Sequence, residues 1–367
     1  MVKKIGIDWP ISSYSGWGVF GLHLCLALLR RKSAQPVLFH EPQVDLTPAQ
    51  QALFSQVELQ KIPSARRVDF PVLHALGNQL ADFGLVSGIG DAGLVFFEEA
   101  VLQDVALERA KKYRSIVAGS QWNGDILRAA GVAHVVVAQQ GYDESVFFPG
   151  PKTPLWPGRF AVFSGGKLEA RKAQDLVLQA FGEFHARHPE ALLVTAWHGF
   201  SDHTDLDLPK SADGKPDLLA WAAAYGIPAD AVEDIGFIPN RLMGDVLRGC
   251  DAALFPNRCE GGTNLVAMEA LASGLPAILS ANTGHLDLLA TVPCWPLKKQ
   301  GASQMPGWGE SDVGECWERL EAIYADPKAA RATALDAARV MQENWSWTQR
   351  AGKVAQALGY YTSLQNE

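Results

Sequence analysis

Short apolar runs alternate with amphipathic segments along most of the chain. The runs are rich in β-branched and aromatic residues, whereas the segments between them repeat apolar residues at helical spacing. In the first half this pattern predicts strands at 4–8, 36–40, 71–74, 93–97, 115–118 and 135–138, and helices at 19–31, 101–112 and 123–130. Strands that alternate with helices are typical of α/β proteins with parallel sheets.

The segment FFPGPKTPLWPG, at 147–158, interrupts the pattern with four prolines and predicts a stiff linker. After it, the pattern predicts strands at 160–163, 191–196, 232–235, 252–255 and 276–279, and helices at 173–187, 216–225, 240–249 and 264–272. The sequence from 328 to 365 is helical in pattern, with a break near 344–347. We therefore expect two α/β domains of similar size, with a ligand-binding cleft between them.

Composition and charge narrow the classes of function. The 367 residues are 48% hydrophobic and 20% charged, which is ordinary for a folded protein with a sizeable core. A formal net charge of −8 disfavours nucleic acid as the main partner. The five cysteines are scattered and form no CxxC pair, which predicts neither disulfides nor a zinc site and fits a reduced, cytoplasmic compartment. The N-terminus does not resemble a signal peptide, and we expect at most weak peripheral membrane contact.

A first candidate motif, Ser15-Gly16-Trp17-Gly18, lies between a predicted strand and a predicted helix. Gly16 and Gly18 would let the backbone approach a ligand closely, and free amides at a helix start attract anions. A simple strand-to-helix turn explains the motif equally well. The spacing is not GxGxxG and no acidic residue follows about 20 positions later, which disfavours a nicotinamide cofactor.

A second motif follows the predicted strand that ends at Phe163. Gly165 and Gly166 open a loop, and Lys167, Arg171 and Lys172 precede the next helix. Cations beside free backbone amides suit a diphosphate, which makes Lys167 and Lys172 candidate ligands. The alternative is a solvated basic turn, in which Arg171 pairs with Glu169.

The third motif, at 255–276, is the strongest. A strand ends at Phe255, a turn containing Gly261 and Gly262 follows, and Thr263 or Asn264 is expected to cap the next helix. Glu269 is expected to lie about one and a half turns into that helix, among apolar neighbours, where a half-buried acid needs a partner. Glu260 comes nine residues before Glu269, which on one helix would put the two acids on opposite faces. If both serve one ligand, Glu260 must lie in the loop.

These motifs together resemble the retaining GT-B glycosyltransferases of the large family 4 type. The resemblance covers almost the whole chain and rests on Gly16–Gly18, 120–122, 141–143, 147–149, 234–239, the Glu260–Glu269 block and 345–347. It implies two Rossmann-like domains facing across a cleft: an acceptor domain at 1–150 and a nucleotide-sugar donor domain at 151–335. It also implies a C-terminal helix at 336–367 that crosses back to the first domain.

The resemblance implies a metal-independent transfer of a hexose from a nucleotide-diphosphate sugar to a hydroxyl group, with no cofactor and no protein nucleophile. Lys167 and Lys172 would stabilise the leaving diphosphate, with loop amides of Gly165, Gly166, Gly261, Gly262, Thr263 and Asn264 nearby. Glu269 would bind the ribose, Glu260 the donor sugar, and Phe237 and Ile238 would border the base.

The sequence departs from the family pattern in two places. The two acids are nine rather than eight residues apart, and Glu98 and Glu99 stand where a histidine is usual. These two glutamates are candidates to bind the acceptor, or form a plain surface pair.

Several alternatives stay open at this point. The base of the nucleotide is of the UDP or GDP type, and the acceptor is a glycan, a protein or a small molecule. A nucleotide-sugar epimerase of the same fold and a non-catalytic nucleotide-sugar-binding subunit are the competing interpretations.

Overall fold

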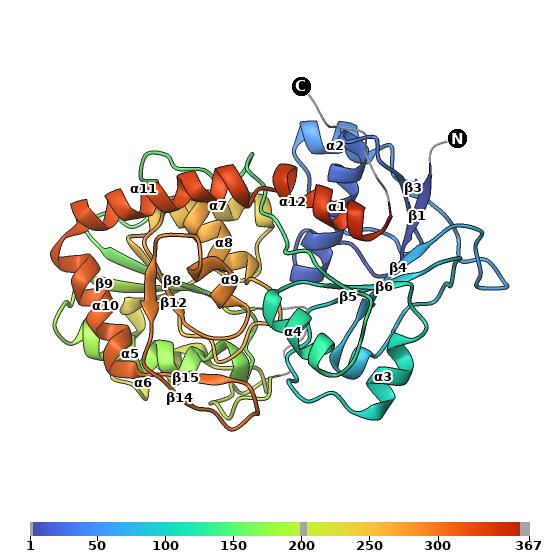
Figure 1. Ribbon diagram of the computed structural model, residues 1–367. Coiled ribbons are helices and arrows are strands. Elements are labelled where there is room, and N and C mark those ends of the chain that lie inside the picture. Colours follow the sequence, from blue (N-terminus) through green and yellow to red (C-terminus); the bar gives the residue numbers. More distant parts are fainter. Residues whose placement is uncertain (1–2, 199–203, 360–367) are drawn as a thin grey trace. The chain divides into compact units, whose positions relative to one another are not determined.

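The computed structural model describes residues 3–198 and 204–359, and the chain divides into two compact units (Figure 1). Unit 1 takes in the described residues up to Asp143, the short segment Gly261–Thr263, and the described residues from Asn344 onward. Unit 2 takes in Glu144–Glu260 and Asn264–Glu343, apart from 199–203. Each unit has its own sheet and is described by itself.

Unit 1 is built on a parallel sheet with the strand order β3-β2-β1-β4-β5-β6-β7. The strands are β1 (Lys4–Ile7), β2 (Gln35–Leu38), β3 (Glu58–Leu59), β4 (Val72–Leu76), β5 (Ala92–Val95), β6 (Ser115–Ala118) and β7 (Val135–Val137). The strands are short and mostly buried, as parallel strands covered on both faces must be.

The helices of unit 1 are α1 (Gly16–Arg30), α2 (Pro48–Phe54), α3 (Asp104–Ala110), α4 (Gln121–Ala129) and α12 (Trp347–Ala357), with the short 3-10 helix η1 (Asn78–Leu80). Helix α12 comes from the far end of the chain and packs against α1 in one apolar core. The rings of Phe20 and Trp347 lie 5.2 Å apart there. The last helix of the chain is therefore part of the first unit.

Unit 2 repeats the architecture with a parallel sheet of order β10-β9-β8-β11-β12-β13. Its strands are β8 (Phe160–Gly165), β9 (Ala191–Ala196), β10 (Val232–Asp234), β11 (Ala252–Phe255), β12 (Ala277–Ser280) and β13 (Trp295–Leu297). The main helices are α5 (Gln174–His185), α6 (Leu218–Ala223), α7 (Asn240–Gly249), α8 (Leu265–Ala272), α9 (His285–Leu289), α10 (Val313–Ala325) and α11 (Pro327–Asn344). An antiparallel hairpin of β14 (Gln300–Ala302) and β15 (Gly309–Ser311) completes it.

In each sheet the strand order reverses beside the first strand. Strand β1 lies between β2 and β4, and β8 lies between β9 and β11. The carboxyl ends of parallel strands meet at one edge of a sheet, and such a switch point separates the loops that follow its two strands. The loops after β8 and β11 therefore meet at the switch point of unit 2.

The α/β class with parallel sheets is confirmed, and the differences from the sequence prediction are local. The prediction lacked β3, α2, α9, α10, β13 and the hairpin, most of which are short segments of mixed polarity with little periodicity. The helix predicted at 101–112 is shorter and begins at Asp104.

The proline-rich segment is not a free linker but lies within unit 2. The Arg248 guanidinium donates to the carbonyl oxygens of Val146 and Phe148, and Arg331 donates to that of Gly150. Proline removes backbone donors but leaves carbonyl oxygens, which arginine side chains bind here.

Within the described residues, no helix combines the length and the apolar character that crossing a bilayer requires.

Candidate active site

A buried ion pair joins the two loops that meet at the switch point of unit 2. Lys172 comes from the loop after β8 and Glu260 from the loop after β11, and Lys172 Nζ lies 2.5 Å from Glu260 Oε1. Their side chains are 10% and 6% exposed, so both charges lie almost out of water. The two residues that the sequence nominated from separate motifs are thus direct partners.

The local backbone turns sharply to deliver Lys172. Gly166 has a φ of +130°, and the aliphatic stem of Lys172 passes close to it, 3.2 Å from where a Cβ would stand. The short 3-10 helix η2 (Ala170–Lys172) follows and ends at Ala173, which has a left-handed φ of 57°. Gln174 closes the loop by donating from Nε2 to the carbonyl oxygen of Lys167 at 2.6 Å. The positive φ of Gly166 therefore favours glycine, and the absence of a side chain leaves room for Lys172.

Burial and charge act in opposite directions on this pair. Burial lowers the pKa of Lys172, and the carboxylate of Glu260 opposes that shift. Burial alone would raise the pKa of Glu260, but the charges of Lys172 and Arg171 outweigh it and hold that pKa below its usual value. The carboxyl group is therefore ionised near neutral pH, and its negative charge favours the protonated form of the Lys172 amine.

In the part of the chain that the structure describes, the partners of the Glu260 carboxylate are side chains. Oε1 accepts from Lys172 and from the Nδ2 of Asn257 in a short contact, and Oε2 lies 3.5 Å from Arg171 Nη1. Arg171 also pairs with Glu169 at 2.6 Å, which is the pairing that the sequence offered as the alternative for Arg171. The backbone amide of Glu260 donates to Thr283 Oγ1 at 2.9 Å, which anchors the loop to the segment after β12.

The helix that follows, α8, begins at Leu265, with Asn264 as its cap. Asn264 Oδ1 accepts from the Ala267 amide, so its Nδ2 donates to His285 Nε2 at 3.0 Å. Burial lowers the pKa of His285 to about 4, and the ring is neutral at pH 7. Its Nδ1–H then donates to Ser280 Oγ at 2.9 Å. The cap thus orients a neutral histidine beneath the start of α8.

Glu269 is buried within α8 and meets a side chain from a different helix. It is 4% exposed, and its Oε1 accepts from Asn240 Nδ2 at 2.7 Å. Asn240 is the first residue of α7, directly after the loop that carries Phe237 and Ile238. The Phe237 ring is 42% exposed and Ile238 is half-buried. The hydrogen bond between Asn240 and Glu269 therefore links α8 to the start of α7, directly after Phe237 and Ile238.

Gly165 ties the end of β8 to the first turn of α8. A Cβ at Gly165 would lie 2.9 Å from Val266 and 2.8 Å from the ring of Phe163. Lys167, by contrast, points outward: its side chain is 55% exposed and lies 3.7 Å from Glu169. Of the two candidate lysines, only Lys172 is held in the buried cluster.

Three of the predicted donor-loop residues, Gly261, Gly262 and Thr263, group with unit 1. A Cβ at Gly261 would lie 2.2 Å from the Phe96 carbonyl oxygen, and one at Gly262 would lie 2.8 Å from the Phe96 ring. Ser120 Oγ also donates to the Gly261 carbonyl oxygen at 2.7 Å. Packing alone therefore accounts for both glycines.

The remaining candidates lie in unit 1. Gly16 begins α1, and the glycine at Gly18 is required because a Cβ there would lie 2.2 Å from Ser12 Oγ. Glu98 and Glu99 follow β5 and are half-buried, and Glu99 Oε2 accepts from Gln79 Nε2 at 2.5 Å.

The sequence analysis missed several residues that build the site: Asn257, Asn240, Thr283, His285 and Arg258. Each is a single polar residue near a strand end or a helix start. No motif or periodicity in the sequence distinguishes it from other polar residues in loops. Their roles depend on partners 29 residues away, as for Asn240 and Glu269, or 88 residues away, as for Arg258 and Ala170.

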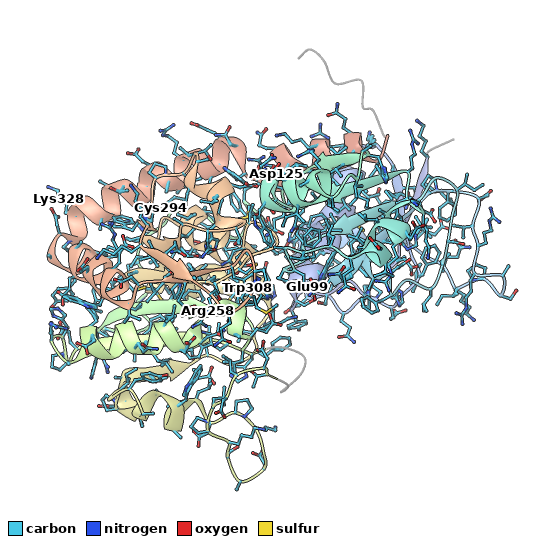
Figure 2. The ribbon with its side chains drawn as sticks, turned by 60° about the horizontal axis from the view of Figure 1, so that its bottom comes forward. Glu99, Asp125, Arg258, Cys294, Trp308 and Lys328 are labelled. Carbon is cyan, nitrogen blue, oxygen red and sulfur yellow. The ribbon has the colours of Figure 1, made fainter. Side chains whose placement is uncertain are left out.

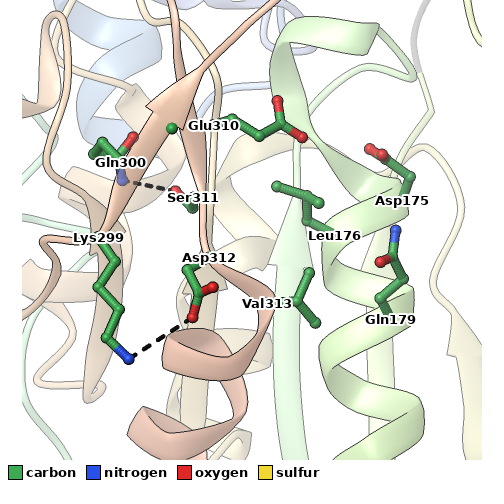
Figure 3. A pocket seen from close by; sticks show the side chains of 10 residues that line it. Asp175, Leu176, Gln179, Lys299, Gln300, Glu310, Ser311, Asp312 and Val313 are labelled. Carbon is green, nitrogen blue, oxygen red and sulfur yellow. Dashed lines mark hydrogen bonds and ion pairs between the residues drawn. The ribbon is translucent and has the colours of Figure 1, made fainter.

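A surface hollow in unit 2 lies beside this cluster but is not lined by it. Figure 3 shows the hollow between the β14–β15 hairpin and α5, with Asp175, Gln179, Gln300 and Glu310 on its walls. None of the residues that the sequence nominated lines it. Within the described ranges, no group of three or more His, Cys, Asp or Glu side chains is arranged to hold a metal ion.

Solved structures define the class of fold. The chain superposes on sucrose-phosphate synthase from Thermosynechococcus elongatus with a TM-score of 0.68 and 14% identity, over 96% of this chain and 98% of that one. Anabaena HepE, solved in complex with UDP-glucose, gives a TM-score of 0.67 and 15% identity, over 98% of this chain and all of the other. Both are glycosyltransferases of the GT-B class, whose two parallel-sheet α/β domains this chain shares.

Residues 120–354 match the family described as Family 4 Glycosyltransferase in conflict systems, and the chain belongs to this family. D-inositol 3-phosphate glycosyltransferase of Rhodococcus jostii is 29% identical over 221 residues, which are 59% of this chain and 45% of that protein. A GDP-mannose-dependent α-(1-6)-phosphatidylinositol monomannoside mannosyltransferase of Mycolicibacterium smegmatis is 25% identical over 52% of this chain and 46% of its own length. The chain thus spans about half the length of these curated relatives.

Proposed function

We propose that the protein transfers a hexose from a nucleotide-diphosphate sugar to a hydroxyl group of an acceptor, with retention of anomeric configuration and without a metal ion. The observation that carries the proposal is the buried Lys172–Glu260 pair at the switch point of unit 2. Ligands of open α/β sheets bind at the carboxyl ends of the strands beside such a point. Family membership and the UDP-glucose complex of HepE support the same donor class.

The charges of the cluster suit a diphosphate that arrives and leaves. Lys172 pairs with Glu260, and Arg171 pairs with Glu260 and Glu169. The phosphates of the donor compete for these two cations, and the Glu260 carboxylate is then released to accept hydrogen bonds from the hydroxyls of the sugar. As the glycosidic bond breaks, charge develops on the leaving phosphate, and Lys172 stabilises it.

The nucleoside half of the donor is assigned to α7 and α8. Glu269 accepts a hydrogen bond from Asn240, the first residue of α7. The loop that carries Phe237 and Ile238 leads directly into α7. A buried carboxylate suits the two ribose hydroxyls, which are paired donors. Phe237 contributes an exposed ring against which a base can pack.

The acceptor side is assigned to unit 1. Glu98 and Glu99 follow the end of β5 there, at the carboxyl edge of the sheet. Carboxylates at this place would accept from acceptor hydroxyls, and the acceptor is a glycan, a protein or a small molecule.

The test is a panel of UDP- and GDP-sugars, screened first by thermal shift and then by release of nucleotide with and without acceptors. A ligand that binds only the folded state raises the melting temperature. Nucleotide release that depends on an acceptor, and that persists in excess EDTA, supports metal-independent transfer. Proton NMR of the first product reports whether the anomeric configuration is retained.

Two other outcomes correspond to the competing interpretations. Conversion of the donor sugar into its epimer without an acceptor would identify an epimerase. Tight nucleotide binding with no turnover of any donor in the panel would identify a binding subunit and contradict the proposal.

A further inference from the structure

Arg258 joins three segments of unit 2 that meet near Lys172 and Glu260. Figure 2 shows it among the side chains of unit 2, and it lies in the loop after β11, two residues before Glu260. Its side chain is 13% exposed. The partners of its guanidinium come from the loop after β8, from the first turn of α5 and from the β14–β15 hairpin.

All five N–H groups of the guanidinium are used. Nη1 donates to Ala170 O at 2.8 Å and to Asp175 Oδ1 at 2.9 Å. Nη2 donates to Asp175 Oδ2 and Glu310 Oε1, both at 2.7 Å, and Nε donates to Glu310 Oε2 at 2.5 Å. In Figure 3 the carboxylates of Asp175 and Glu310 point toward each other from α5 and the hairpin. Only a planar fork with five donors satisfies this set, so lysine cannot replace arginine here.

The backbone of Arg258 makes a second set of links between the same segments. Its amide donates to Arg171 O at 2.8 Å, and the next amide, of Cys259, donates to the same oxygen at 3.2 Å. Its carbonyl oxygen accepts from the Gly309 amide at 3.0 Å. The chain at Arg258 is thus bound directly to the residue that precedes Lys172.

We infer that Arg258 is a positioning residue for the reaction proposed above: it holds the Lys172 loop and the Glu260 loop in register, through Ala170 and Arg171 on one side and the hairpin on the other. The inference rests on the proposed function, because it assigns Arg258 to the alignment of a phosphate-binding lysine with a sugar-binding glutamate. Arg258 itself contacts neither reacting group. Loss of the fork would leave binding of the nucleoside by α7 and α8 largely intact and would misplace Lys172 against the leaving phosphate.

The test compares Arg258→Lys with the parent chain and with Arg159→Lys. Arg159 is the matched control, because it is also half-buried and ties three backbone carbonyls, of Glu190, Ala191 and Asp230, at the opposite end of β8. We expect Arg258→Lys to lower kcat by at least tenfold and to change the dissociation constant for uridine or guanosine, which lack the phosphates that Lys172 would bind, by less than threefold when measured by calorimetry. Arg159→Lys is expected to keep both values, whatever its melting temperature.

Glu310→Gln serves as a second variant if Arg258→Lys does not fold. It keeps the shape of the hairpin side chain but removes one of the two carboxylates that hold the fork, and a smaller fall in kcat is expected. An unchanged kcat in folded Arg258→Lys, assayed well below its melting temperature, would overturn the inference.

Hydrogen exchange separates this inference from the proposed function. In Arg258→Lys, the amides of 169–173 and 256–260 are expected to exchange faster together, while those of α7 do not. If the parent chain turns over no nucleotide sugar, the proposed function is wrong. Unchanged hydrogen exchange of 169–173 and 256–260 in Arg258→Lys would show, independently of activity, that Arg258 does not couple the two loops.

Discussion

Each unit contains a buried ionic cluster, and the two clusters differ in what binds the carboxylates. In unit 1, His74 on β4 lies 3.3 Å from Asp91, 3.5 Å from Asp82 and 3.8 Å from Asp8. In unit 2, Lys172 and Arg171 surround Glu260. Both clusters include groups from the loops that follow the two strands of a switch point: Asp8 and Asp82 come after β1 and β4, and Lys172 and Glu260 come after β8 and β11.

The aspartates of unit 1 accept from backbone amides in addition to the side chains of His40, His74 and Tyr113. Asp8 accepts from the Val86 amide at 2.8 Å, Asp82 from the Gly84 amide at 2.7 Å, and Asp91 from the amides of Val72 and Gly88. A carboxylate that completes backbone bonds cannot change partner without local unfolding. The unit 1 cluster therefore fastens the segment between β4 and β5 to the sheet, and it is part of the fold.

Within the described residues, the carboxylate of Glu260 is held by the side chains of Lys172, Asn257 and Arg171. Side chains can turn to a new partner while the backbone stays in place. We therefore expect the kind of donor, more than burial or charge, to separate a structural cluster from one that can exchange ligands. Substitutions in both clusters test this distinction.

Lys172→Ala is expected to reduce transfer by ~100-fold or more, because it removes a fixed charge aimed at the leaving phosphate. The variant also leaves Glu260 buried without its nearest cation, so its melting temperature should fall. Initial rates with the preferred donor, taken below that temperature, measure the effect. Lys215→Ala, at a lysine whose side chain is 61% exposed, is the control and should match the parent. A folded Lys172→Ala variant with the parent rate would show that the cluster is structural.

Glu269→Ala is expected to weaken nucleotide binding by about 10- to 100-fold, since hydrogen bonds to a charged group contribute roughly 1.5–3 kcal/mol each. Calorimetric titration with UDP or GDP measures it. Glu318→Ala changes a glutamate whose side chain is 54% exposed and should leave the affinity unaltered. Equal affinity in Glu269→Ala and the parent would remove the ribose role.

His74→Gln tests the fixed cluster through stability and pH. Burial would lower the pKa of His74, but Asp82 and Asp91 raise it from 6.5 to about 9. Because the folded pKa lies above the unfolded value, the stabilisation is fully present below pH 6.5 and is lost as the pH rises through 9. The loss amounts to at most ~3 kcal/mol.

The measurement for His74→Gln is hydrogen exchange of the β4 amides at pH 6 and pH 9, corrected for intrinsic rates. The parent should open more easily at pH 9, and His74→Gln should show little difference between the two values. His198→Gln, in unit 2, should behave as the parent does. A variant with the full pH dependence would mean that His74 does not hold this segment.

Glu260→Gln is expected to shift the alkaline limit of nucleotide binding to lower pH. Glu260 opposes the effect of burial on Lys172, so its removal lets the Lys172 pKa fall further. Binding of phosphates needs the protonated amine and is lost as the pH rises through that lower value. The affinity for the nucleotide, measured from pH 6 to 10, gives the shift. An alkaline limit at the same pH as in the parent would contradict the proposal that Lys172 exchanges Glu260 for the phosphates of the donor.

Much of the candidate site could be predicted because its residues lie at strand ends and helix starts, where local signals are strong. Asn264 as the cap of α8, Glu260 in the preceding loop and Glu269 with a partner all follow from short-range rules. The hydrogen bonds of the Arg258 guanidinium could not be predicted, because the residues that accept them are 52, 83 and 88 positions away in the sequence. Gly261 and Gly262 suited a ligand-binding loop by type, yet packing against Phe96 explains them.

The alternation of strands and helices, the parallel α/β class, and the motifs containing Lys172, Glu260 and Glu269 can all be predicted from the amino-acid sequence. They depend on periodicity and on neighbours within about one turn or one loop, which the linear order records. The folded structure was needed to show that Lys172 pairs with Glu260 while Lys167 stays exposed, and that the proline-rich segment lies within unit 2. Partner choice in a buried cluster depends on the distances between loops that the folded sheet brings together, and no local pattern contains those distances.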